Sequence, residues 1–281
     1  MYIFKHKLDL QSFILTQKQA GKTVGFVPTM GALHQGHTAL VKRSNTENSL
    51  TVGSIFVNPT QFNNPGDLAK YPRTIDTDIE KLIEADCTAL FLPEVDEMYD
   101  EVISGEFDFG YVGTVYEGEH RPGHFSGVAT IVKKFFEIIT PTNAYFGKKD
   151  YQQWLIVTDM AKKLNTGINV VGCPTIREDD GLAMSSRNLR LSEEERAVAS
   201  KIPKALFYLK DAVGKTNFNE AVDNARKSLI SDDLIELEYL DVVDSKTLLP
   251  LNSWDSVNGI TAITALKVGE IRLIDNLQLT E

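Results

Sequence analysis

Two histidines, His34 and His37, flank Gly36 in the segment PTMGALHQGH (residues 28–37). Imidazole donates a hydrogen bond when neutral and adds positive charge when protonated. Three residues apart across the start of a helix, the two rings can face the same side. We therefore expect them to surround a polyphosphate and to stabilise charge that develops on it as a bond to the α-phosphorus forms.

The sequence around the histidines predicts a strand, a tight turn and a helix. Residues 24–27 form a short apolar run typical of a buried strand, which Pro28 and Gly31 then break. Residues 38–43 have the composition of a helix that ends in cations. A helix N-terminus presents free N–H groups and a positive dipole, which suit phosphate, and Gly36 would allow a close approach. The alternative, that one histidine only caps the helix and the other lies at the surface, is less favoured for a pair in this setting.

A second polar cluster, GKKDYQQ (147–153), lies where a predicted strand at 143–146 passes into a predicted helix at 151–164. A lysine there can pair with phosphate, and Asp150 can hold a ribose hydroxyl or orient the lysine. Gln153, one turn into the helix, can hydrogen-bond a small substrate. The alternative is a charged loop with a solvated helix start.

Two further clusters contain cations. MSSRN (184–188) combines hydroxyls with an arginine, which suits an anion clamp, although a capped linker would have the same composition. HRPGH (120–124) contains two imidazoles, but no third metal ligand stands at suitable spacing. A basic rim or a structural loop is therefore favoured over a metal site, and Arg121 stays a candidate for contacting a substrate or phosphate.

The order of elements predicts an α/β fold. Apolar strands at 24–27, 50–57, 88–92, 143–146 and 168–172 alternate with helices, which indicates a Rossmann-like parallel sheet over residues 1–175. We expect a breaker-rich loop at 63–72 and irregular chain at 94–124. Helices near 192–213 and 217–230 and strands near 235–243, 260–267 and 271–275 predict a smaller α+β domain over residues 176–281, which closes over the active site.

Composition limits the partners. The 281 residues carry a net charge of −10, which argues against a broad nucleic-acid surface. No apolar run reaches the length of a membrane span, and the N-terminus is too polar for a signal peptide. Cys87 and Cys173 lie in or beside apolar runs, so we expect buried free thiols in a cytoplasmic protein. The sequence has no GxxxxGK[ST], GxGxxG, GxSxG or HExxH motif.

Six motifs together resemble the pantothenate synthetase (pantoate–β-alanine ligase) family of the nucleotidyltransferase superfamily. They are PTMGALHQGH (28–37), FVNPTQF (56–62), YPRT (71–74), RPGHFSGVATIV (121–132), YFGKKDYQQ (145–153) and REDDGLAMSSRN (177–188). The resemblance implies that ATP drives condensation of (R)-pantoate with β-alanine through a pantoyl-adenylate, releasing AMP and pyrophosphate. It also implies Mg²⁺ and a homodimer. Asp76 and Asp78 are possible outer partners of the metal, whose ligands stay unassigned.

The resemblance also implies roles for residues. It makes His37, as general acid, and His34, Lys149 and Arg187 the catalytic group. The implied ATP contacts are Met30, Gly31, Ala32, Leu33, His34, Gln35, Gly36, His37, Gly147, Lys148, Lys149, Asp150, Ile176, Met184, Ser185, Ser186 and Arg187. Gln61 and Gln153 would bind pantoate, with Asn58 and Arg121 as supporting groups. The family often has glutamate where this chain has Lys148, which we expect to be a surface change that leaves the chemistry intact.

Two other hypotheses stay open at the level of sequence. Another adenylyl- or cytidylyl-transferase of the superfamily would share the histidines but would not need Gln61 and Gln153 as a pair. A non-catalytic ATP-binding regulatory protein would bind ATP without turnover. The second is opposed by the presence of His34, His37, Lys149 and Arg187 together.

Overall fold

The computed structural model describes residues 1–62, 65–99 and 107–280, and the chain divides into two compact units. The first contains Met1–Lys148 and Gln152–Pro174, and the second contains Lys149–Tyr151 and Thr175–Glu281. The three residues 149–151 therefore pack with the second unit, although the chain on both sides of them belongs to the first.

The first unit is built on a six-stranded sheet in the order β1-β4-β3-β2-β5-β6, and all neighbouring strands pair in parallel. The strands are β1 (Tyr2–Phe4), β2 (Val24–Thr29), β3 (Leu50–Ile55), β4 (Ala89–Phe91), β5 (Asn143–Gly147) and β6 (Asn169–Cys173). From β2 the order runs outward through β3 and β4, and then restarts on the other side with β5. Open α/β sheets bind ligands beyond the carboxyl ends of the strands at such a reversal.

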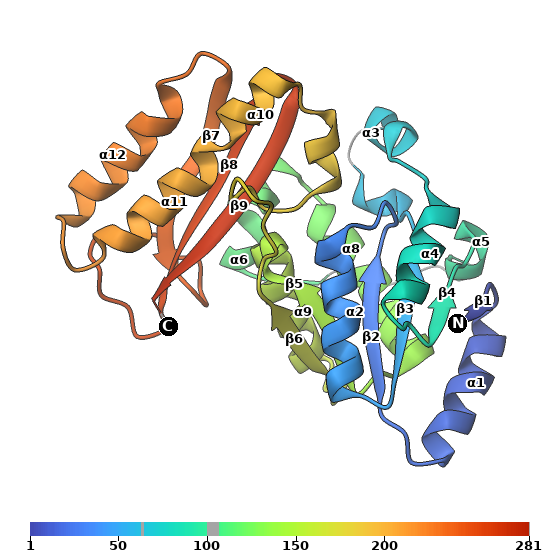
Figure 1. Cartoon of the computed structure of the whole chain (residues 1–281). Helices are drawn as coiled ribbons and strands as arrows, with labels where there is room; N and C mark the ends of the chain where they lie inside the picture. Colours follow the sequence, from blue (N-terminus) through green and yellow to red (C-terminus); the bar gives the residue numbers. More distant parts are fainter. Residues whose placement is uncertain (63–64, 100–106, 281) are drawn as a thin grey trace. The chain divides into compact units, whose positions relative to one another are not determined.

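Helices cover both faces of this sheet, which explains why its central strands are almost wholly apolar. On one face α2 (Gln35–Glu47) and α4 (Ile75–Glu84) bury Leu40 and Leu82 against strand residues. On the other face α1 (Lys7–Gln19), α8 (His124–Ile139) and α9 (Tyr151–Lys163) pack around Phe26. Figure 1 shows α2 lying alongside β2.

The parallel α/β prediction is confirmed, but two local predictions were wrong and one strand was missed. The expected loop at 63–72 contains α3 (Pro65–Lys70), which begins at a proline, a residue favoured at the first helical position; residues 63–64 lie outside the described part. The expected irregular stretch at 94–124 contains the short helices α5 (Val95–Met98), α6 (Tyr111–Thr114) and α7 (Glu117–His120), and its residues 100–106 lie outside the described part. Strand β1 was not expected, since it is three residues long and lies at the sheet edge.

The second unit places helices on an antiparallel sheet, as expected for an α+β fold. The sheet order is β7 (Ile235–Asp244), β8 (Ile260–Val268) and β9 (Ile271–Thr280). Helices α11 (Lys201–Ala212) and α12 (Phe218–Ile230) pack on it (Figure 1), and α10 (Glu193–Ala199) precedes them. The break between α10 and α11 falls just before Pro203. None of the helices in the described ranges is long and apolar enough to cross a membrane.

Candidate active site

The two histidines contact each other at the start of α2. His34 is the N-cap residue, and its Nδ1 accepts the N–H of Gly36 at 3.1 Å. The N–H of His34 donates to Nδ1 of His37 at 3.2 Å, and the ring centroids lie 4.1 Å apart. Because each Nδ1 is an acceptor, these bonds assign the proton of each neutral ring to Nε2. The turn thus holds two imidazoles as Nε2–H donors.

The helix start differs in one respect from the sequence prediction. The N–H groups of Gly36 and His37 are bonded inside the turn, to the His34 ring and to the His34 carbonyl. The expectation that these N–H groups are free for phosphate was therefore wrong for both. A histidine does cap the helix, but it does so while its ring lies beside the second histidine. Capping and pairing are compatible here.

The side chain of Asn58 is engaged by the protein. It is 1% exposed, donates to the carbonyl of Gly127 at 3.2 Å, and accepts the hydroxyl hydrogen bonds of Tyr99 at 2.5 Å and Thr60 at 3.1 Å. Burial raises the pKa of Tyr99, which keeps its hydroxyl a donor. Gly127 is required for this packing, because a Cβ there would lie 2.5 Å from the Thr60 carbonyl oxygen.

Asn58 therefore fixes the 3₁₀ turn η1 (Pro59–Gln61) that carries Gln61. The side chain of Gln61 is buried, and its main-chain oxygen lies 3.1 Å from Nδ1 of His124. The imidazole of His124 thus braces the same turn from α8. These contacts set Gln61 just beyond the carboxyl end of β3, within the first unit.

Gln152 and Gln153 have different surroundings. Gln152 is buried, accepts the N–H of Glu117 at 3.1 Å, and donates to the carbonyls of Val112 at 2.6 Å and Val115 at 2.8 Å. It fixes the short helices α6 and α7. Gln153 is half-buried on the same first turn of α9.

Arg121 follows α7, and its guanidinium lies 3.9 Å from the carboxylate of Glu117. Glu117 is buried, so moving the Arg121 guanidinium away would take a cation from beside a buried carboxylate, which is unfavourable. Arg121 is therefore held by an acidic side chain of its own segment. Among the described residues no group of three or more His, Cys, Asp and Glu side chains is arranged to hold a metal ion.

Three cations of the second unit gather at one pocket. It is lined by Lys149, Leu182, Ala183, Ser185, Arg187, Arg272, Leu273 and Ile274. Ser185 caps the 3₁₀ helix η3 (Ser186–Arg190) by accepting the N–H of Arg187, whose guanidinium donates to the carbonyl of Arg272 at 3.4 Å. Lys149 also lies 3.5 Å from Asp150. A pocket of this kind, here called the anion pocket, can bind an anionic group.

The loop that carries Met184 is a small hairpin. The N–H of Met184 donates to the carbonyl of Ile176 at 2.9 Å, and Arg177 pairs with Ala183 in an antiparallel bridge. Arg177 also forms two hydrogen bonds to the buried carboxylate of Asp275, at 2.7 and 3.1 Å. Ile176 and Met184 are therefore neighbours, anchored to β9.

The sequence profile of the family described as pantoate–β-alanine ligase matches residues 2–278. The chain belongs to this family. It is 45% identical to a pantothenate synthetase of Bacteroides fragilis over 273 residues, 97% of each chain. A pantothenate synthetase structure from Thermus thermophilus is 41% identical, covers both chains fully and has a TM-score of 0.93. A pantoate–β-alanine ligase from Francisella tularensis, solved with β,γ-ATP and β-alanine, is 34% identical with a TM-score of 0.81, covering 99% of this chain and 98% of that one.

Within this ligase the expected site residues fall into two sets. The first unit contains the His34–His37 turn, Asn58, Gln61, Arg121, Gly147 and Gln153, and the second contains Lys149, Asp150, Ile176 and residues 184–187. Lys148, where the family often has glutamate, belongs to the first unit, and its ammonium lies 4.9 Å from the ring centroid of Trp154.

The sequence did not single out Arg272 and Lys81, and it indicated Asp78 only as a possible outer partner of Mg²⁺, although all three contact predicted site segments. Arg272 lines the anion pocket, and its guanidinium is held by Glu238 with contacts of 2.8 to 3.0 Å. Asp78 and Lys81 of α4 contact the turn before His34. The only sequence signal for Asp78 was a carboxylate in the first turn of a predicted helix, which has a simpler explanation as a favourable charge at a helix start.

Proposed function

We propose that this ligase joins pantoate to β-alanine in two steps that share one activated intermediate. A carboxylate oxygen of pantoate attacks the α-phosphorus of ATP, the bond to the bridging oxygen breaks, and pyrophosphate leaves. The amine of β-alanine then attacks the acyl carbon of the pantoyl-adenylate, loses a proton and expels AMP. The family match over residues 2–278 carries this proposal.

In the first step, negative charge passes to the leaving pyrophosphate. We assign His37 as the general acid and His34 as a second hydrogen-bond donor, because both rings present Nε2–H groups. Fixed donors of this kind stabilise charge without reorganising during the reaction. Lys149, Ser185, Ser186 and Arg187 would bind phosphate, as the cation-lined pocket of the second unit supports.

The remaining assignments concern binding. Gln61 and Gln153 would hydrogen-bond pantoate, with Gln61 also near β-alanine. Asp150 would hold the ribose, and Ile176 would contact adenine through its backbone. Asn58 acts through the η1 turn rather than on the substrate, since its carboxamide is engaged by Gly127, Tyr99 and Thr60.

Mg²⁺ would be bound mainly through the ATP phosphates and water, as is usual for this ion. The carboxylate of Asp78 supports this assignment, because both of its oxygens already accept main-chain N–H groups. When bound, the ion neutralises phosphate charge. We also propose a homodimer, on the family resemblance, and a cytoplasmic location, which the two free buried cysteines favour. Closure of the second domain would exclude water from the acyl-adenylate.

Release of pyrophosphate from Mg-ATP tests the proposal. We expect release that requires pantoate and continues through many turnovers only when β-alanine is added, with pantothenate as product. Release that is independent of pantoate, or sustained without β-alanine, would contradict the two-step order. ATP binding without release would favour a regulatory protein.

A further inference from the structure

Helix α4 contacts the turn before His34 through both kinds of main-chain polar group, two N–H donors and one carbonyl acceptor. Oδ2 of Asp78 accepts the N–H of Ala32 at 2.9 Å, and Oδ1 accepts the N–H of Leu33 at 2.7 Å. The ammonium of Lys81, three residues further along α4, donates to the carbonyl of Leu33 at 2.6 Å. Residues three apart on a helix lie on the same face, so a single face of α4 makes all three contacts.

The carboxylate of Asp78 is enclosed by the protein at this position. Its side chain has no exposed surface and also accepts the hydroxyl of Thr74 at 3.1 Å. A Cβ on Gly31 would lie 3.1 Å from Oδ2 and would have to displace the carboxylate slightly, and the φ of +84° at this position also favours glycine. Ala32 follows with φ +50°, a backbone conformation that residues other than glycine rarely adopt unless surrounding contacts stabilise it. The two N–H groups of this strained turn converge on one anionic side chain.

The contact from Lys81 continues to the catalytic turn. The carbonyl of Leu33 and the N–H of His34 belong to the same peptide group. That peptide accepts from the Lys81 ammonium at its oxygen and donates from its nitrogen to Nδ1 of His37 at 3.2 Å. A charged donor at the oxygen strengthens the N–H as a donor, because linked hydrogen bonds polarise one another.

We propose that Lys81 and Asp78 are positioning residues that act on His37 through the Leu33–His34 peptide. Asp78 holds the turn in its strained conformation, and Lys81 polarises the peptide that keeps Nδ1 of His37 an acceptor. The proton of the neutral ring then stays at Nε2, on the opposite side of the ring. The kinetic consequence of this inference rests on the proposed function, whereas the predicted tautomer of His37 does not.

The first measurement is the tautomer of His37, which does not depend on turnover. Long-range ¹H–¹⁵N correlation spectra of the full chain resolve the two nitrogens of each of the five imidazoles, and a His37→Gln variant assigns the signal. In the wild type we expect the Nε2–H tautomer. In Lys81→Met we expect a mixture of the two tautomers, and in Lys81→Arg a return to Nε2–H. An unchanged His37 signal in Lys81→Met would overturn the proposal.

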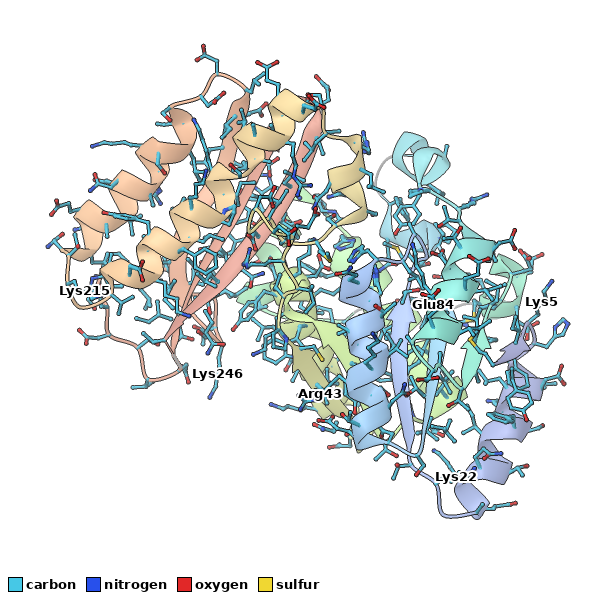
Figure 2. The ribbon with its side chains drawn as sticks, in the orientation of Figure 1. Lys5, Lys22, Arg43, Glu84, Lys215 and Lys246 are labelled. Carbon is cyan, nitrogen blue, oxygen red and sulfur yellow. The ribbon has the colours of Figure 1, made fainter. Side chains whose placement is uncertain are left out.

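The second measurement is the kinetics of the same variants. We expect pyrophosphate release by Lys81→Met to fall about 10- to 100-fold in kcat, by analogy with the loss of an outer hydrogen-bond partner of a metal-ligating imidazole, with a smaller change in the KM for ATP. Lys22→Met is the control, because Lys22 lies just before the amino end of β2 (Figure 2), whereas the His34 turn follows its carboxyl end. A loss in both variants, or a loss in Lys81→Met that follows its drop in Tm alone, would show a merely structural role.

Asp78→Asn provides an independent test, since it places an amide N–H against the main-chain donors. We expect a larger loss of activity than in Lys81→Met, together with a lowered Tm. If Asp78→Asn does not fold, the two Lys81 variants still decide the question. An inactive wild type with a correct His37 tautomer would contradict the proposed function and leave the positioning role standing.

Discussion

The side-chain amide of Asn276 donates a 2.8 Å hydrogen bond to the main-chain oxygen of Lys149. Lys149 lies in the turn η2 (Lys148–Asp150) between β5 and α9. The hydroxyl of Tyr151 also donates to the carbonyl of Ser245 at 2.7 Å. The backbone that positions Lys149, for which we propose phosphate binding, is therefore held by β9 and by the end of β7.

Replacing Asn276 with alanine tests this dependence. We expect the KM for ATP to rise several-fold while kcat changes less, because a buried hydrogen bond contributes about 1 kcal/mol and its loss displaces Lys149. Gln278→Ala is the matched control, as Gln278 is exposed two residues further along β9. Steady-state kinetics with varied ATP provide the measurement. Similar KM values for ATP in the two variants would show that Asn276 has no effect on ATP binding.

His37→Ala should leave the fold intact and lower adenylate formation about 10²- to 10³-fold, the usual cost of one transition-state donor. The control is His6→Ala, since the side chain of His6 is 71% exposed and pairs with Glu97. Single-turnover pyrophosphate release and thermal melting are measured together. Wild-type release by His37→Ala would end its assignment as the general acid.

The fold was largely readable from the sequence because its signals are local and repeated. Strands such as β2 and β3 are short, mostly apolar runs that are buried, and helices between them impose parallel pairing. Strand β1 was missed because three residues at an edge carry no periodicity. Helix α3 was missed because proline and glycine, read as loop residues, stand at its first two positions.

The site could be predicted from the sequence only where its polar and titratable side chains lie in one short segment. His34 and His37 share a turn, so their contact followed from their spacing. The hydrogen bonds of Asp78 and Lys81 with the turn before His34 join residues 45 to 48 positions apart, which no local pattern encodes. Arg272 lines the anion pocket from a strand whose sequence resembles any other amphipathic strand. Long-range packing, rather than residue type, gives these side chains their roles.

Arg187 and Arg190 provide a matched pair on η3, since both are exposed and only Arg187 is among the residues lining the anion pocket. We expect Arg187→Ala to lower kcat/KM for ATP about 100-fold, and Arg190→Ala to change it less than about twofold. Losing an arginine that binds phosphate removes charge-assisted hydrogen bonds, whereas an exposed arginine elsewhere contributes little. Equal effects would mean that general surface charge, rather than the pocket, attracts ATP.

The adjacent glutamines should separate binding from folding. Gln153→Ala is expected to raise the KM for pantoate about tenfold with little effect on ATP or on Tm. Gln152→Ala should lower Tm, because the donors and acceptors of Glu117, Val112 and Val115 lose a buried partner. Equal losses of pantoate and ATP binding in Gln153→Ala would count against the pantoate pocket.

The carboxylate of Asp244 should make the second unit sensitive to acid. Burial opposes its charge, but hydrogen bonds from Ser256, Asn258 and Thr247 outweigh burial and hold the pKa of Asp244 well below its usual range. A carboxyl with a depressed pKa in the folded state stabilises the fold above its unfolded pKa of about 3.9. That stabilisation is lost as the pH falls from about 4 toward the folded pKa.

Asp244→Asn therefore should destabilise the protein by about 2 kcal/mol at pH 7 and by clearly less at about pH 2.5, because protonation has by then removed part of the wild-type advantage. Urea unfolding of wild type and variant at both pH values measures the difference in free energy. Asp255→Asn, an exposed change in the same loop, is the control and should show no such dependence. A difference for Asp244→Asn that stays constant or grows at the lower pH would mean that these donors hold the carboxyl group by its shape and not by its charge.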